Sequence, residues 1–104
     1  MEIISERTDD ILELAIIGSL DTTTAPQLER EIKENIQSIN RIFIDMDETE
    51  FVSSAGLRVL FKTHKVMKKK KGKMQISGVN EEVMNVFIIT GFKDKMDIRA
   101  KENT

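Results

Sequence analysis

Short apolar runs alternate with amphipathic stretches along this chain. The run Ile11–Ile17 is short and apolar and follows turn-like residues at 8–10, a pattern typical of a buried strand. It is expected to pair with an opening strand as a β-hairpin and to end where Gly18 breaks it. Comparable runs recur further along, and strands are expected at residues 2–6, 11–17, 42–44, 73–77 and 96–99. The acidic segment 45–50 is expected to be a loop.

Amphipathic stretches between these strands predict helices. In the first, apolar residues recur at three- and four-residue intervals from Ala25 to Ile39. Thr24 stands before it in the Thr-x-x-Gln form of a capping box. The second helix follows the serine pair at 53–54, and Gly72 is expected to end it in the left-handed conformation common at helix C-termini.

A third helix is expected between Asn80, as its N-cap, and Gly91, as its stop. The predicted order of elements is therefore ββαβαβαβ, an α/β fold. Strands joined by crossover helices pair in parallel, whereas the opening hairpin is antiparallel. The pattern thus predicts a mixed central sheet of about five strands.

The composition excludes several kinds of active site. The 104 residues suffice for one hydrophobic core, and we expect a single domain over residues 1–104. The chain has no cysteine, which excludes disulfides, thiolate nucleophiles and thiolate zinc sites. A single histidine argues against a histidine triad or a histidine metal cage. We therefore expect neither a cofactor nor a bound metal.

The composition also bears on where the protein works. The first ten residues are acidic and lack the basic and long apolar regions of a secretory signal. No segment approaches the ~18 apolar residues of a membrane span. We expect a cytoplasmic protein that does not bind membranes.

Charge is distributed unevenly along the chain. Residues 1–53 carry 13 acidic and 4 basic side chains, whereas residues 54–104 carry 5 acidic and 12 basic ones. This asymmetry predicts local electric fields around the serine pair, where the two halves meet. The lysine run 68–71 has no interleaved aromatic residues and is explained by the favourable interaction of cations with the C-terminal end of a helix. We expect no nucleic-acid partner.

The segment Phe51–Leu57 is the most informative part of the sequence. It places Ser53 and Ser54 where the acidic loop ends and the second helix begins. The first turn of a helix has unpaired backbone N–H groups and a partial positive charge, so a serine there can cap the helix or carry a phosphate. Gly56 would permit close approach of another backbone, and Leu57 either anchors the helix or contributes to a contact. Arg58 follows one turn after Ser54 and is positioned to pair with such a phosphate.

A second motif suggests different chemistry. The segment Ile42–Thr49 resembles the first motif of haloacid-dehalogenase-like phosphotransferases, an apolar strand followed by Asp-x-Asp-x-Thr. That resemblance implies Asp45 as a nucleophile, Asp47 as general acid/base and Mg²⁺ as the counter-charge. Glu48 stands where that family usually has glycine. Acidic residues at the carboxyl end of a strand also keep a loop solvated, and we prefer this simpler interpretation.

A longer resemblance extends over nearly the whole chain. Four segments in this order and spacing resemble the STAS family of anti-sigma factor antagonists: Gly18–Asp21, Ile44–Asp45, Phe51–Leu57 and Gly91–Phe92. The resemblance implies a single domain with a mixed sheet and helices mainly on one side. It also implies a regulatory binding protein and not an enzyme.

The resemblance assigns the switch residue of that family to Ser54. It implies phosphorylation there by an anti-sigma factor with serine kinase activity, and dephosphorylation by a PP2C-type phosphatase. The unphosphorylated protein would bind the anti-sigma factor and free the sigma factor, and the phosphorylated protein would release its partner. Residues expected to contact the partner are Asp21, Thr22, Thr23, Ser53, Ser54, Ala55, Gly56, Leu57 and Arg58.

Two residues depart from the family pattern. Ser53 occupies a position often held by aspartate, and Ala55 replaces a common second hydroxyl residue. Ser53 is therefore an alternative phosphate acceptor. A STAS scaffold or transport-regulatory module that binds partners without a phosphoserine cycle remains the alternative function.

Overall fold

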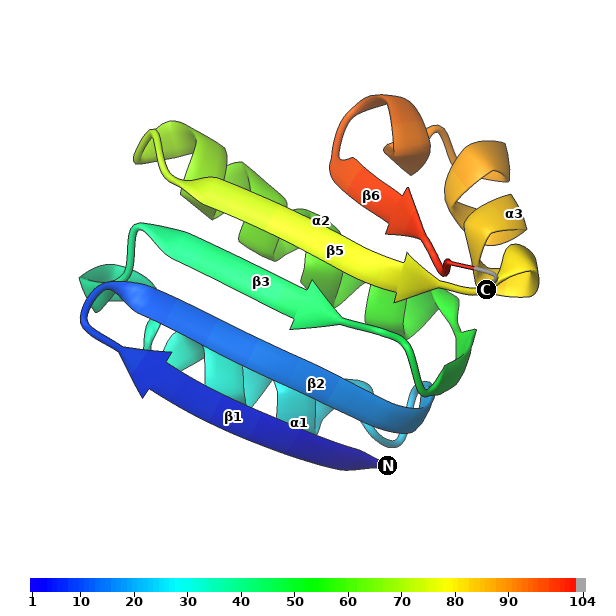
Figure 1. Cartoon of the computed structure of the whole chain (residues 1–104), viewed down its shortest axis with the longest axis horizontal. Coiled ribbons are helices and arrows are strands. Elements are labelled where there is room, and N and C mark those ends of the chain that lie inside the picture. Colours follow the sequence, from blue (N-terminus) through cyan, green and yellow to red (C-terminus); the bar gives the residue numbers. More distant parts are fainter. Residues whose placement is uncertain (103–104) are drawn as a thin grey trace.

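The computed structural model describes residues 1–102 and shows a mixed sheet with helices packed against one of its faces (Figure 1). In chain order the elements are β1 (Glu2–Thr8), β2 (Ile11–Leu20), α1 (Ala25–Lys33), the 3-10 helix η1 (Ile36–Ser38), β3 (Arg41–Asp45), β4 (Thr49–Val52), α2 (Ser54–Lys69), β5 (Lys73–Val79), α3 (Glu81–Ile89), the 3-10 helix η2 (Phe92–Asp94) and β6 (Asp97–Ala100). The strand order is β1-β2-β3-β5-β6, and β4 pairs with β2.

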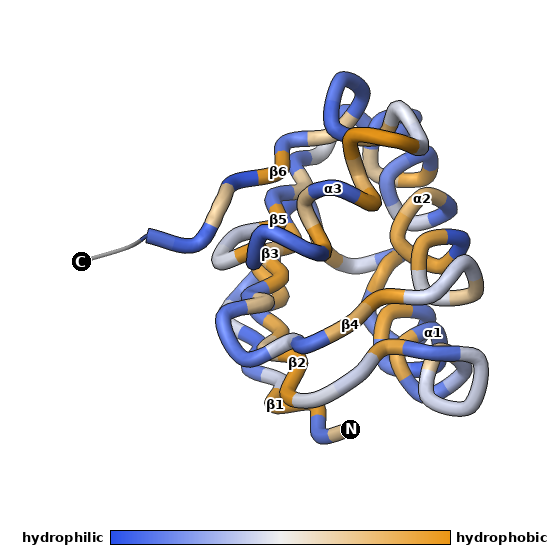
Figure 2. The backbone as a smooth tube through the Cα atoms, turned by 90° about the vertical axis from the view of Figure 1, so that its right-hand side faces the viewer, coloured by the Kyte–Doolittle hydropathy of each residue, from blue (hydrophilic) through white to orange (hydrophobic). Residues whose placement is uncertain are grey.

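The topology follows from how the strands are connected. β1 and β2 form an antiparallel hairpin, and every other pair of strands is parallel. Figure 2 shows the sheet on edge, with α1 and α2 together on one side of it. The predicted α/β class, the mixed sheet and the helices mainly on one side are confirmed.

The core lies between the sheet and the helices. Alternate residues of β2 and β3, such as Leu14 and Ile44, are fully or nearly fully buried on the helix side. Leu28 of α1 and Leu60 of α2 are buried against that side. Burying one such side chain contributes about 1.5–3 kcal/mol, so the apolar stripe of each helix and the alternation of each strand together determine which face is covered.

The prediction that residues 45–50 form only a loop is wrong, because β4 begins at Thr49. β4 runs parallel to the last residues of β2 and pairs Leu20 with Val52. The hydroxyl of Thr49 is buried and donates a hydrogen bond of 2.7 Å to the carbonyl oxygen of Ile16. Acidic neighbours hid this strand in the sequence.

The expected break of β2 at Gly18 is also wrong. β2 continues to Leu20, and Gly18 adopts a φ of 101° where the register between β2 and β4 shifts. Glycine tolerates this left-handed backbone, so it bends the strand without ending it.

Two helix ends differ from expectation. α1 stops at Lys33 and is followed by η1, so Ile39 lies outside the helix although its side chain is buried. At the end of α2, Lys71 and not Gly72 adopts the left-handed conformation, with a φ of 61°. Gly72 is needed for space, because a Cβ atom there would lie 2.7 Å from the carbonyl oxygen of Asn40.

Helix capping matches the sequence at one of the two expected N-caps. Asn80 caps α3, since its side-chain oxygen accepts a hydrogen bond of 2.8 Å from the backbone N–H of Val83. Gly91 ends that helix region with a φ of 81°, as expected. Thr24 makes no side-chain cap bond, so the predicted capping box is wrong. Its hydroxyl instead donates to the carbonyl oxygen of Ser19 at 2.8 Å.

Replacement of Thr49 by valine tests how strongly β4 is held to β2. Thr49→Val removes the donor to Ile16 and leaves a buried carbonyl unpaired, which costs about 1–3 kcal/mol. We expect the free energy of unfolding, measured by chemical denaturation, to fall by that amount. Thr22→Val, at an exposed threonine, is the control and should change it little. Equal effects of the two substitutions would contradict this role of Thr49.

Candidate functional site

The site forms where the ends of β2 and β4 lie side by side. Leu20 pairs with Val52 across the two strands, and the backbone N–H of Ser53 donates a hydrogen bond of 2.8 Å to the carbonyl oxygen of Leu20. This pairing brings the loop after Leu20 next to the start of α2. The structure thus brings Asp21–Thr23 and the serine pair together, two segments that the resemblance groups as expected partner contacts.

Ser53 is the N-cap of α2. Its backbone is extended, and its side-chain oxygen accepts a long hydrogen bond of 3.4 Å from the backbone N–H of Gly56. This contact satisfies one of the unpaired N–H groups of the first turn. The Ser53 hydroxyl is therefore engaged in holding the helix start.

Ser54 is the first residue of α2, and its side chain is exposed. Within residues 1–102 its hydroxyl makes no hydrogen bond to a protein group. It stands in the first turn, where the backbone N–H groups and the helix dipole favour negative charge. The arrangement leaves this hydroxyl accessible to a modifying enzyme.

Gly56 and Leu57 face inward. A Cβ atom on Gly56 would lie 2.7 Å from the Leu20 side chain and 3.0 Å from its carbonyl oxygen, so the close approach that glycine permits is to β2 of the same chain. Leu57 is 7% exposed and belongs to the core, which makes it the anchor of the helix. Ala55, between the exposed Ser54 and the buried Gly56, is half-buried. These residues fix α2 and offer little or no surface of their own.

Arg58 is exposed one turn after Ser54. It takes part in none of the ion pairs formed within the described chain. A guanidinium at this spacing from position 54 can reach an anion on the same helix face.

The loop after β2 is ordered by one carboxylate. Oδ1 of Asp21 accepts hydrogen bonds from the backbone N–H groups of Thr23 at 2.9 Å and Thr24 at 3.0 Å. These bonds, the one from the Thr24 backbone foremost, hold the pKa of Asp21 below its usual value. Thr22 and Thr23 are exposed, so the turn presents two threonines beside the start of α2.

Phe51 is a feature of this site that the sequence interpretation did not assign. It lies on β4 three residues before Ser54, and half of its surface is exposed. Exposed Glu48 and Glu50 precede it in the chain. An exposed aromatic side chain beside a candidate site is a frequent anchor of protein contacts. The signal in the sequence was an apolar residue directly after an acidic run.

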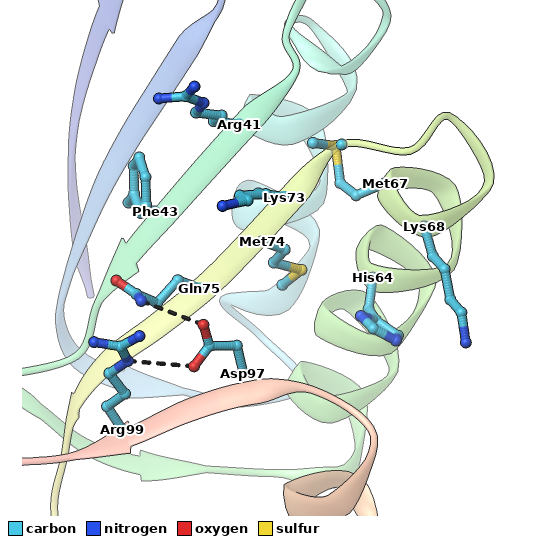
Figure 3. A pocket seen from close by; sticks show the side chains of 11 residues that line it. Arg41, Phe43, His64, Met67, Lys68, Lys73, Met74, Gln75, Asp97 and Arg99 are labelled. Atoms are coloured by element: carbon cyan, nitrogen blue, oxygen red, sulfur yellow. Dashed lines mark hydrogen bonds and ion pairs between the residues drawn. The ribbon is translucent and has the colours of Figure 1, made fainter.

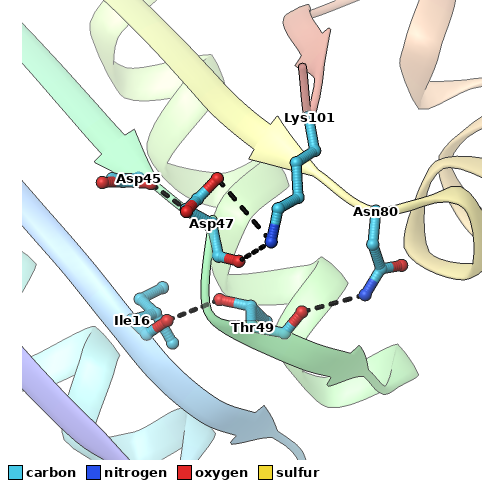
Figure 4. A network of polar contacts seen from close by, with 6 residues as sticks. All are labelled: Ile16, Asp45, Asp47, Thr49, Asn80 and Lys101. Carbon is cyan, nitrogen blue, oxygen red and sulfur yellow. Dashed lines mark hydrogen bonds and ion pairs between the residues drawn. The ribbon is translucent and has the colours of Figure 1, made fainter. Parts of the chain in front are cut away.

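Asp45, the last residue of β3, and Asp47 form a turn at the end of that strand (Figure 4). Oδ1 of Asp45 accepts a hydrogen bond of 2.8 Å from the backbone N–H of Asp47, and the Asp47 carbonyl oxygen accepts one of 2.9 Å from Nζ of Lys101. Gly78 lies directly against the turn, where a Cβ atom would be 2.8 Å from the Asp47 nitrogen. Residues 1–102 contain no cluster of three or more potential ligands suited to a metal ion. These contacts are those of a structural turn.

A separate hollow of about 480 Å³ lies near the other end of α2 (Figure 3). Its lining includes Arg41, Lys68 and Arg99 together with His64, whose pKa is lowered by burial and by the charge of Lys68. None of the residues at the start of α2 lines it. The hollow is distinct from the Ser54 site.

Comparison with known proteins agrees with this architecture. The family model of the STAS domain matches residues 2–104. The chain belongs to the STAS domain family. The anti-sigma-B factor antagonist of Bacillus subtilis (strain 168) is 28% identical to it over 96 residues, which cover 92% of this chain and 88% of that protein.

Solved structures share the fold of this STAS domain. The anti-sigma factor antagonist SpoIIAA in its unphosphorylated form aligns with a TM-score of 0.83 at 18% identity, covering 93% of this chain and 87% of that chain. The Bacillus cell fate determinant SpoIIAA in its phosphorylated form aligns with a TM-score of 0.77 at 17% identity, covering 93% of this chain and 90% of that chain.

In residues 1–102, no helix has the length and apolar character to cross a membrane.

A pair of substitutions separates packing from surface chemistry at the start of α2. Gly56→Ala places a Cβ atom against Leu20 and should lower the free energy of unfolding by about 1–3 kcal/mol. Ser54→Ala, at an exposed position, should change it by less than about 0.5 kcal/mol. Denaturant unfolding of both variants checks this, and a large loss from Ser54→Ala would show that Ser54 holds the fold.

Proposed function

We propose that this STAS domain is an anti-sigma factor antagonist that acts by partner switching. In its unphosphorylated form it binds an anti-sigma factor with serine kinase activity, and phosphorylation of Ser54 releases it. A PP2C-type phosphatase restores the binding form, and the cycle takes place in the cytoplasm. The protein is a substrate of these enzymes and is not itself an enzyme.

The observation that carries this proposal is the contrast between the two serines. Ser53 is committed to capping α2, whereas the exposed Ser54 hydroxyl has no hydrogen-bond partner in the described chain. A kinase needs a free hydroxyl, and Ser54 offers one. The role is supported by the anti-sigma factor antagonists among its relatives, and by SpoIIAA, whose structure is known in unphosphorylated and phosphorylated forms.

The fold accommodates a phosphate at this position. The group adds about −1.5 to −2 charges, and the first turn of α2 supplies N–H groups and a favourable dipole. The change is therefore confined to the surface. The Asp21–Thr23 turn and Arg58 lie close to Ser54, and Phe51 is exposed on β4 three residues before it. A partner fitted to the uncharged form would therefore meet new charge and bulk within the contact.

The partner surface is made by residues that the fold leaves free. Thr22, Thr23, Ser54 and Arg58 are exposed, and Phe51 supplies an aromatic anchor. Asp21, Ser53 and Ala55 are half-buried and shape the edge of the contact. Gly56 and Leu57 act from within, by holding α2 against β2.

The phosphate acceptor can be identified by intact mass and fragment mapping of protein recovered from its own host, before and after PP2C-type phosphatase treatment. We expect one removable phosphoryl group on Ser54. Ser54→Ala should abolish it, and Ser53→Ala should retain it. Phosphate found on Ser53 instead would show that Ser53 is the acceptor in this cycle. Its absence from both serines under several growth conditions would contradict the cycle and favour a STAS scaffold or transport-regulatory module that binds constitutively.

Arg58 is expected to neutralise the phosphate. In protein phosphorylated at Ser54, Arg58→Ala should lower the melting temperature by a few degrees relative to the phosphorylated parent, because a charge-assisted contact is lost. In unphosphorylated protein the same substitution should have little effect. Thermal unfolding is measured for the parent and for Arg58→Ala, each with and without the phosphate, and the two melting-temperature differences are compared. Arg30→Ala, on the exposed side of α1, is the control. A loss independent of the phosphate would contradict the pairing.

A further inference from the structure

One face of the sheet carries no helix. α1 and α2 cover the opposite face, and in Figure 1 the bare face is turned toward the viewer. We call it the open face and define it as the side of β1, β2, β3, β5 and β6 that bears Glu13, Phe43 and Gln75, opposite the buried residues of those strands. Predominantly parallel sheets are usually covered on both faces. The open face therefore calls for a reason.

Two like-charge pairs of opposite sign lie on the open face. Glu6 stands directly across from Glu13 in the β1–β2 ladder, and Arg41 directly across from Lys73 in the β3–β5 ladder. All four side chains are exposed, and none belongs to an ion pair within residues 1–102. Figure 3 shows Arg41 and Lys73 on their adjacent strands. Like charges directly opposite one another destabilise a sheet, and no ion pair within residues 1–102 offsets the repulsion in either pair.

The two pairs divide the open face into halves. The acidic pair lies on β1 and β2 and the basic pair on β3 and β5, so the boundary runs between β2 and β3. Half-buried Ala15 and Phe43 stand at this boundary. A two-fold axis along the boundary would set β2 over β3 of a second copy, and β1 over its β5. The acidic pair of each copy would then face, across an apolar centre, the strands that carry the basic pair of the other copy. That side of the open face also bears Asp45 on β3 and the Asp97–Arg99 ion pair on β6.

The spacing allows the opposite charges to meet. Glu13 pairs with Phe43, and Arg41 lies two residues before Phe43 on the same strand. The charged pairs are thus offset by about 7 Å along the strands, which extended arginine and lysine side chains span. Two aligned sheets also cross at about 30°, and this rotation further changes the offset between the acidic pair of one copy and the basic pair of the other.

We propose that the open face is a docking site for a second copy of this chain, in a two-fold dimer that sets the acidic pair of each copy near the basic pair of the other. Five strands about 4.8 Å apart and about six residues long give a flat area of roughly 500 Å², smaller than the roughly 800 Å² per partner of a standard interface. The dimer is accordingly weak and depends on concentration. It leaves Ser54 accessible, because Ser54 begins a helix on the other side of the sheet.

Sedimentation velocity over protein concentrations from about 10 μM to about 1 mM tests the dimer, since weak interfaces dissociate in this range. We expect a reversible shift from monomer to dimer that weakens as salt is added, because exposed charge pairs are screened. Glu13→Arg and Arg41→Glu should each raise the dissociation constant about tenfold or more, since each residue is used twice in a two-fold interface.

The double variant gives the decisive comparison. Glu13→Arg combined with Arg41→Glu exchanges the charges across the interface and should restore dimerisation. Each single substitution turns a like-charge pair within the sheet into an opposite-charge pair but sets like charges at the diagonal positions 13 and 41. The melting temperature of each single variant is therefore measured as well, so that loss of the dimer is distinguished from unfolding. Arg30→Glu, an equal charge reversal on the exposed side of α1, should leave the dimer intact.

Three results would overturn the proposal. They are a monomer at every concentration, failure of the double variant to recover the association that the single variants lose, and equal weakening by Arg30→Glu. None of them bears on the Ser54 cycle, because the open face and the start of α2 share no residue.

Discussion

The pairing of β4 with the last residues of β2 is the contact on which the candidate site depends. It joins Leu20 to Val52 and lets the N–H of Ser53 bond the carbonyl oxygen of Leu20. Through these hydrogen bonds two segments some thirty residues apart in sequence come to share one surface. The buried Thr49 hydroxyl fixes the beginning of the same strand. Without this short parallel ladder, the Asp21 turn and the start of α2 would have no fixed relation.

Buried and exposed residues of the site have different roles. Gly56 allows α2 to approach Leu20 closely, and Leu57 inserts into the core, so both determine where the helix begins. Ser53 caps the first turn, and Ser54 is left with a free hydroxyl. A charge added at Ser54 therefore acts on a rigid platform. The helix N-terminus is suited to hold that charge, which makes a change of surface without a change of fold physically reasonable.

Much of the fold was predictable because hydrophobic periodicity is a strong signal for long elements. The opening hairpin, the three helices and the mixed sheet followed from it. β4 was missed because Thr49 and Phe51 are interrupted by glutamate, and only the pairing with β2 makes so short a strand stable. The end of α1 was misplaced because Ile39 is buried from outside the helix. Gly72 was misread because its role depends on contact with Asn40, which local sequence does not reveal.

The location of the candidate site was predicted from the sequence, but the roles of several of its residues were not. The order of motifs located Ser54 and the Asp21 turn, which the structure brings together. Sequence did not distinguish which serine caps the helix, because serine suits an N-cap at either position and the extended backbone of Ser53 decides between them. It also did not reveal that Gly56 packs within the chain, or that Phe51 is exposed beside the site.

Backbone amide chemical shifts test most directly the claim that Ser54 is a local switch on a rigid fold. They should be compared between unmodified protein and protein phosphorylated at Ser54. We expect the shifts to change around residues 51–58 and in the turn at 21–24, while those of β2, β3 and β5 in the core stay the same. Changes spread through the sheet, or loss of dispersed signals from α2, would contradict it.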